Sequence, residues 1–203
     1  MSTTGAAAAP QDGENPRMEQ LLKEAGEGVP GAMGRLIEAV YPDLRRLAGA
    51  YMARERPNHT LQPSALVNEL YMRMAGKKGN AWAGRSHFFA AVAMHMRRIL
   101  VDSARSKRAG KRGKGEAVSL PPDLPAAGGP DAVNVLVLDE ALTRLAELHE
   151  RQARLVELRY FGGLSLEEAA AVLGIAERTA KRDWAMAKAW LHSVLSNPPK
   201  AGK

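Results

Sequence analysis

The stretch that decides the fold runs from Ser165 to Leu191, with the sequence SLEEAAAVLGIAERTAKRDWAMAKAWL. Ser165 and Glu168 have the spacing of a capping box, which predicts that a short helix begins at Ser165. Gly174 supplies a turn residue that tolerates positive φ, and Ala170 is a small residue at the point where two helices would cross. The second helix has an apolar seam at Ala180, Trp184, Ala187 and Leu191. This spacing is typical of a helix-turn-helix, although two helices of any bundle can share it.

The other side of the second helix carries cations near its start. This is where a helix-turn-helix contacts bases and phosphates, and Arg178 has the forked donors that guanine accepts. Lys181 and Lys188 suit contacts with the DNA backbone, which position without specifying. A solvated helix face pairing with Glu177 and Asp183 remains the alternative for any one residue. The predicted DNA-binding residues of this helix are Arg178, Thr179, Lys181, Arg182 and Lys188.

The start of this helix departs from the usual pattern. Ala176 stands where Ser, Thr or Asp commonly caps a helix, and it forfeits a cap worth about 1 kcal/mol.

The 203-residue chain is predicted to be all-α, because Ala and Leu far outnumber its ten aromatic residues. Between Gly113 and Asp131 four prolines and four glycines interrupt every periodic pattern, which predicts a flexible Pro/Gly linker between two small helical domains. We expect a disordered tail over 1–16, an N-terminal helical bundle over 17–112, a linker over 113–133, a C-terminal four-helix domain over 134–196 and a tail over 197–203.

Apolar residues recur at helical spacing on both sides of this linker. In the N-terminal half they predict helices over Met18–Ala25, Met33–Tyr51, Leu66–Met74 and Phe88–Ser103. In the C-terminal half Leu138, Leu142, Leu145 and Leu148 form one stripe, and a second helix carries Leu155, Val156 and Tyr160 before Gly162 and Gly163 end it.

The net charge of +7 comes from a single segment. Between Arg97 and Lys114 eight basic residues stand against Asp102 alone, leaving 21 basic and 21 acidic residues in the rest of the chain. Such a localised excess favours a polyanion such as nucleic acid, with a solvated helix end and an anionic membrane surface as alternatives.

The chain contains no cysteine, which excludes disulfides and thiolate metal sites and indicates a reducing compartment. No stretch looks like an export signal or a membrane anchor, so we expect a cytoplasmic protein without membrane contact. No cofactor or metal is expected.

Three segments together resemble the two-domain sigma factors of the extracytoplasmic-function (ECF) group, and the resemblance spans about Met18 to Leu195. They are residues 45–74 (RRLAGAYMARERPNHTLQPSALVNELYMRM), 87–113 (HFFAAVAMHMRRILVDSARSKRAGKRG) and 138–191 (LDEALTRLAELHERQARLVELRYFGGLSLEEAAAVLGIAERTAKRDWAMAKAWL). The Thr-Leu-Gln-Pro at 60–63 and the Lys-Arg-Asp-Trp at 181–184 are most similar to the ECF-like subgroup.

The resemblance implies an RNA polymerase sigma factor. By similarity, residues 17–112 bind the polymerase core and open the minus-ten element, and the C-terminal domain binds the minus-thirty-five element. The clamp helices of the largest polymerase subunit would be contacted by Asn68, Glu69 and Arg73, and the minus-ten element by Trp82, Arg85, His95, Arg98 and Arg105. Trp82 could stack on a flipped promoter base or pack against Phe88. Arg98 stands where relatives often have Asn, so minus-ten recognition cannot be transferred from them.

The resemblance also allows an anti-sigma factor or another regulator as a partner, and we expect the free protein to be a monomer. Two rival interpretations come from other classes. An enzyme would have to use His87, His95 or Asp102, but no nucleophile or phosphate-binding loop accompanies them, so no catalytic residue is predicted. A stand-alone helix-turn-helix regulator would bind operator DNA without the polymerase.

Overall fold

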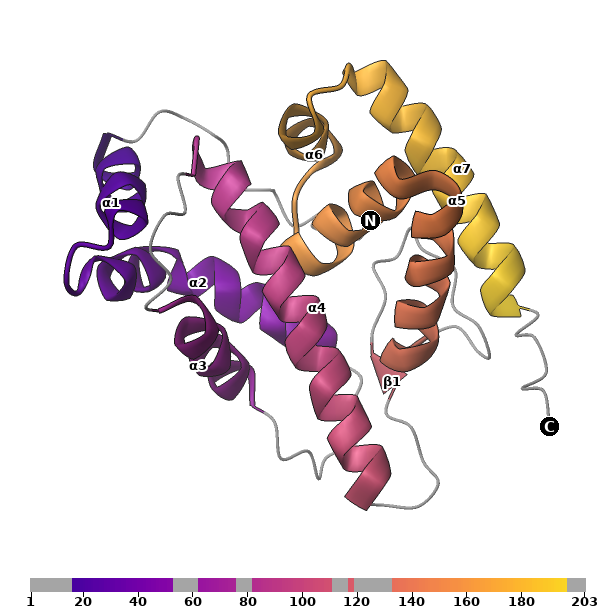
Figure 1. The fold of residues 1–203 in the computed structure, drawn as a ribbon, viewed down its shortest axis with the longest axis horizontal. Coiled ribbons are helices and arrows are strands. Elements are labelled where there is room, and N and C mark those ends of the chain that lie inside the picture. Colours follow the sequence, from indigo (N-terminus) through magenta and orange to yellow (C-terminus); the bar gives the residue numbers. More distant parts are fainter. Residues whose placement is uncertain (1–15, 53–61, 76–81, 111–116, 119–132, 197–203) are drawn as a thin grey trace, which may run out of the picture.

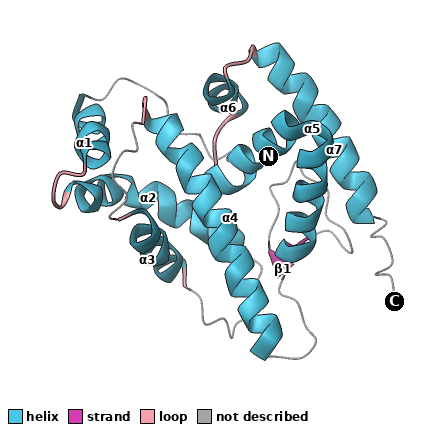
Figure 2. Ribbon diagram, in the orientation of Figure 1, coloured by secondary structure: helices cyan, strands magenta, loops and turns pink. Residues whose placement is uncertain are grey.

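The structure is a computed structural model that describes residues 16–52, 62–75, 82–110, 117–118 and 133–196. The helices are α1 (Pro16–Glu27), α2 (Ala32–Met52), α3 (Pro63–Met74), α4 (Arg85–Gly110), α5 (Val135–Gly162), α6 (Leu166–Leu173) and α7 (Glu177–Ser196). Figure 2 shows how far helix dominates the described chain, which confirms the predicted all-α class.

A short antiparallel pair of strands lies within the predicted linker and at its C-terminal boundary. In this pair β1 (Ala117–Val118) aligns with β2 (Val133–Asn134), with Ala117 opposite Asn134. These strands were not predicted, because two residues are too few to establish an alternating pattern. The rest of the predicted linker and both predicted tails fall almost entirely outside the described residues.

The N-terminal half consists of α1 to α4, with most of each predicted apolar stripe turned inward. Tyr71, which the predicted pattern of α3 includes, is instead 36% exposed because it lies about 100° around the helix from the buried Leu70. Leu36, Leu44, Leu66 and Leu70 are completely buried between α2 and α3, and Phe88, Val92 and Met96 are completely buried on α4. Pro63 occupies the first turn of α3, where its missing N–H costs no helical hydrogen bond. The packing of these stripes fixes the helices in place and leaves the opposite faces of α3 and α4 exposed.

The C-terminal half begins with α5, which is bent. His149 has non-helical angles (φ −148°, ψ 75°), so two helical segments meet there, as the two apolar stripes predict. Leu138, Leu142 and Leu145 are completely buried, but Leu148 is 61% exposed. The prediction that Leu148 continues the buried stripe is therefore wrong, because the bend at His149 ends the regular helical repeat one residue later.

The helix-turn-helix is formed by α6 and α7. The Ser165 hydroxyl accepts from the Glu168 amide at 3.0 Å, and the Ser165 amide donates to the Glu168 carboxylate at 2.6 Å, which confirms the capping box. Gly174 ends α6 in the left-handed conformation (φ 63°, ψ 33°). The predicted seam of α7 is buried along its whole length, so the second helix is fixed against α5 and α6.

The two halves share one apolar core, and α4 lies between α1–α3 and α5–α7 (Figure 1). The Tyr51 hydroxyl at the end of α2 donates to the Tyr160 carbonyl of α5 at 2.8 Å. Burial raises the pKa of Tyr51 well above its usual value, so this hydroxyl keeps the proton that it donates. The longest interface between the halves runs along α4 and α5.

Among the described helices, none has the length and apolar character that a membrane span requires.

Candidate nucleic-acid interface

The first candidate surface is the α7 face, defined by Arg178, Lys181 and Arg182. All three side chains are exposed near the start of the helix. The Lys181 ammonium lies 2.5 Å from the Glu177 carboxylate, and the Arg182 guanidinium lies 4.0 Å from that of Asp183. Arg178 has no ion-pair partner among the described residues. The structure therefore brings the three predicted cations together and leaves Arg178 ready for a bidentate contact.

Two other residues predicted for this surface are less exposed. Thr179 is half-buried in the first turn, and its amide donates to the Ala176 carbonyl at 2.9 Å. Lys188 is half-buried two turns further along, with its nitrogen 5.9 Å from the centre of the Trp184 ring.

The α7 face is held in place from behind by buried charge and an aromatic ring. Asp183 is only 2% exposed and accepts from Arg151 of α5 at 2.6 Å. This hydrogen bond raises the pKa of Arg151, which favours the charged form of the guanidinium. The Arg159 guanidinium lies 4.1 Å from the centre of the Trp184 ring, a cation–π contact. These contacts fix the rotation of α7, and with it the direction in which Arg178 points.

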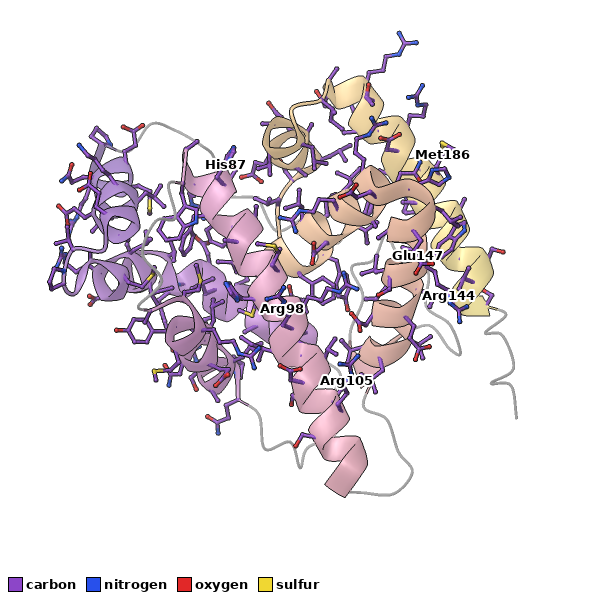
Figure 3. All side chains as sticks on the ribbon, viewed as in Figure 1. His87, Arg98, Arg105, Arg144, Glu147 and Met186 are labelled. Atoms are coloured by element: carbon purple, nitrogen blue, oxygen red, sulfur yellow. The ribbon has the colours of Figure 1, made fainter. Side chains whose placement is uncertain are left out.

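The second candidate surface is the α4 face, defined by Arg97, Arg98 and Arg105. Figure 3 shows Arg98 and Arg105 on the part of α4 that runs beside α5. All three arginines line a cavity of about 300 Å³ between these helices, together with Asp139 and Glu157 of α5. His95 is half-buried on the same helix. Of this surface the sequence predicted His95, Arg98 and Arg105 but missed Arg97, because the carboxylates facing it lie more than 40 residues away in the chain.

Trp82 and Arg85 lie at the other end of α4, about 20 Å from Arg98 by helical rise. Trp82 packs edge-on against Phe88, with the ring centres 5.3 Å apart, and is half-buried. Arg85 contacts Asp43 of α2 at 2.6 Å, and its guanidinium covers the Phe89 ring at 4.5 Å. Of the two alternatives weighed for Trp82, the structure has the packing contact with Phe88.

The third candidate surface is the α3 face, defined by the exposed residues Asn68, Glu69 and Met72. Glu69 accepts a hydrogen bond from Arg73 at 2.8 Å, and Arg73 also donates one to Asp102 of α4 at 3.0 Å. Hydrogen bonding to Glu69, and less strongly to Asp102, raises the pKa of Arg73. Met72 is 69% exposed beside Glu69, and it was not predicted from the sequence. From the sequence alone, a methionine in a helix is expected in the apolar core. The exposed position of Met72 becomes clear only once the structure shows that Leu66, Leu70 and Met74 form the buried face of α3.

Comparison with known families agrees with this arrangement. The sequence model of the family described as ECF sigma factor matches residues 15–197, which includes every described helix. Among curated proteins, none matches the chain. The chain therefore belongs to the ECF sigma factors, a family of non-enzymatic transcription initiation factors that direct RNA polymerase to promoters.

Proposed function

We propose that this sigma factor binds a promoter at two separate elements and that each half of the chain binds one of them. In this proposal the α7 face binds the minus-thirty-five element in the major groove. The α4 face and the region around Trp82 bind and open the minus-ten element. The observation that carries the proposal is the buried seam of α7, which leaves Arg178, Lys181 and Arg182 together on the outer side.

Within the α7 face we assign base recognition to Arg178 and backbone contacts to Lys181 and Arg182. Arg178 has five donors in a planar fork and no competing carboxylate among the described residues, which suits guanine O6 and N7. Lys181 is already paired with Glu177, so a phosphate must compete with that carboxylate. Lys188 lies too far along the helix to share the groove contacts of Arg178, and a flanking phosphate suits it better.

We assign the α3 face to the clamp helices of the largest polymerase subunit. Its inner side is buried in the core through Leu66, Val67 and Leu70, so only the outer side can contact a partner. Glu69 offers a carboxylate beside the exposed thioether of Met72, and such a mixed surface fits a basic, partly apolar helix. We expect the protein to act in the cytoplasm as a monomer that joins the polymerase core.

The test is transcription in vitro with purified core polymerase on genomic fragments, followed by mapping of the start sites. The proposal predicts discrete start sites that share two upstream elements and depend on this protein. Tight, symmetric binding of an operator without the polymerase, together with no core-dependent initiation, would contradict it in favour of a stand-alone regulator.

A matched pair of variants tests the docking surface. Glu69→Lys reverses a charge on the α3 face and should weaken core binding at least tenfold, whereas Glu38→Lys makes the same change at an exposed position of α2. Equal core affinities of the two variants, measured by fluorescence anisotropy, would exclude the α3 face as the docking surface.

A further inference from the structure

Arg73 is the residue through which α3 is bridged to α4. Its Nε donates to the Glu69 carboxylate of α3 at 2.8 Å, and its Nη2 donates to the Asp102 carboxylate of α4 at 3.0 Å. The side chain of Arg73 is 30% exposed, whereas those of Glu69 and Asp102 are 49% and 56% exposed. Two carboxylates that solvent reaches easily thus share one cation that lies deeper, and each of them belongs to a different candidate surface.

Asp102 stands out on the α4 side of this bridge. It is the only acid in the basic segment from Arg97 to Lys114. Asp102 follows Arg98 by four residues and precedes Arg105 by three, so these three side chains share one face of α4. All three are exposed, and all three line the same cavity beside α5. Asp102 therefore places a negative charge between two arginines that are proposed to contact the promoter.

An unbalanced carboxylate at this position would oppose the binding of DNA. Duplex DNA carries one negative charge per about 1.7 Å of helix axis, so phosphates come close to any side chain that lies between two phosphate-binding arginines. Like charges brought together across an interface lower the affinity. The Arg73 guanidinium supplies a charge that cancels that of Asp102, and it does so from α3 rather than from the α4 face itself.

The bridge also keeps Asp102 away from the arginines of its own helix. Arg98 and Arg105 both lie at the spacing at which helical ion pairs form with Asp102. In the structure Asp102 is paired with Arg73, and Arg105 instead lies 3.5 Å from the Asp139 carboxylate of α5. Because Arg73 holds Asp102, this carboxylate does not compete with phosphates for the exposed arginines of α4.

We infer that Arg73 is a positioning residue of the promoter-binding face of α4, where it neutralises and orients Asp102, and that it does not dock on the polymerase. The inference rests on the proposed function above. It revises the role that the sequence resemblance gives to Arg73, which is a contact with the clamp helices beside Asn68 and Glu69. Arg73 is half-buried while those two residues are exposed, and its donors already serve two carboxylates of the protein.

The experiment measures the affinity of the polymerase complex for its mapped promoter fragment by fluorescence anisotropy. At about 0.1 M salt, Arg73→Gln should weaken binding about threefold, the size of effect expected from one partly exposed charge. Arg35→Gln is the matched control, because Arg35 of α2 makes a similar bridge between helices to Glu24 of α1 at 2.7 Å. It should leave promoter binding unchanged. Equal affinities of the two variants would overturn the inference.

A second variant separates the effect of charge from a loss of structure. Asp102→Asn weakens the same bridge as Arg73→Gln but removes the negative charge, so it should bind the promoter at least as tightly as the unaltered protein. A bridge that only holds α3 against α4 would make both variants bind more weakly. Weaker binding by Asp102→Asn would therefore overturn the inference. This variant also carries the test alone if Arg73→Gln does not fold, as thermal unfolding would reveal.

The salt dependence gives a readout that a purely structural role would not change. The Debye length falls from about 10 Å at 0.1 M salt to about 3 Å at 1 M, so the difference in affinity between Arg73→Gln and Arg35→Gln should shrink as salt is added. Arg73→Lys keeps the charge and should lose less affinity than Arg73→Gln. A difference that stays constant with salt would contradict the role given to the charge of Arg73.

The affinity for core polymerase tests the other half of the inference. Arg73→Gln should bind the core no more weakly than Arg35→Gln, because the exposed Glu69 carboxylate is left in place. Weaker core binding by Arg73→Gln than by this control would return Arg73 to the docking surface and overturn the inference.

Core-dependent initiation by the unaltered protein separates this inference from the proposed function. Initiation together with equal promoter affinities of Arg73→Gln and Arg35→Gln rejects only the role of Arg73. A lack of initiation rejects the proposed function, and this inference with it.

Discussion

The α7 face and Arg97 of the α4 face carry the same kind of charge in different surroundings, although Arg98 and Arg105 beside Arg97 are exposed. On α7, Lys181 and Arg182 are 65% and 70% exposed, and the only carboxylates near them among the described residues belong to the same helix. On α4, Arg97 is 20% exposed and faces two carboxylates from the other half of the chain. Positive charge in a sequence therefore identifies a surface that can bind DNA, but tertiary contacts decide whether that surface is available.

The packing of α5 on the N-terminal half depends on the apolar end of α5, and removing part of that end gives the largest expected effect. Phe161 is completely buried, and its ring centre lies 6.2 Å from that of Tyr51. Phe161→Ala should lower the free energy of unfolding by about 3–5 kcal/mol, measured by urea denaturation. Leu148→Ala, at a 61% exposed position on the same element, should change it by less than about 0.5 kcal/mol. Similar losses for the two variants would mean that the halves do not share a core.

The role of the exposed α7 face in base recognition is tested by replacing Arg178. Arg178→Ala should cost about 1–3 kcal/mol in promoter binding by the polymerase complex, with the loss confined to promoters that keep one particular base pair in the minus-thirty-five element. Lys188→Ala should weaken binding of all promoters by a smaller and uniform amount. Binding titrations against single-base promoter variants make the comparison, and a uniform loss for Arg178→Ala would argue against base recognition.

The turn at Gly174, which sets the orientation of α7, should be destabilised by a substitution that changes only the backbone preference. Gly174 has φ 63° and nothing within 4 Å of a Cβ position, so Gly174→Ala adds strain without a clash. We expect a loss of about 1 kcal/mol in the free energy of unfolding. Gly49→Ala in α2 should instead stabilise by about 0.5–1 kcal/mol, because alanine favours the helix. Thermal or urea unfolding of the pair checks the opposite signs.

The smallest effect is expected at the start of α7, where the sequence departs from the usual cap. The Ala176 carbonyl accepts from the amides of Thr179 and Ala180 at 2.9 and 3.1 Å, which places Ala176 at the N-cap without a side-chain acceptor. Ala176→Ser should raise the free energy of unfolding by about 0.5–1 kcal/mol. The same change at Ala171, exposed inside α6, should lower it slightly. A loss at both positions would show that Ala176 is not the cap.

Local features were predictable from the sequence because each rests on spacing within a few residues. The capping box at Ser165, the turn at Gly174 and the seam of α7 follow from helix periodicity, and all are present in the structure. The outward position of Leu148 was not predictable in this way, since no proline or glycine in the sequence marks the bend at His149 that follows it.

Contacts between the halves were beyond the reach of the same reasoning. A segment rich in proline and glycine suggested independent domains, and nothing in the periodicity of α4 links Arg97 to Asp139. The division into residues 17–112 and 134–196 stays a prediction, but the shared core shows that the two halves contact each other extensively.

The distance between the halves can be measured directly, because the chain contains no cysteine that would compete for a label. His87→Cys on α4 and Glu147→Cys on α5 place spin labels at exposed positions in the two halves (Figure 3). We predict one narrow distance distribution for the free protein and a longer, altered distribution once core polymerase is bound. The same narrow distribution in both states would contradict the proposal that each half of the chain binds its own promoter element on the polymerase.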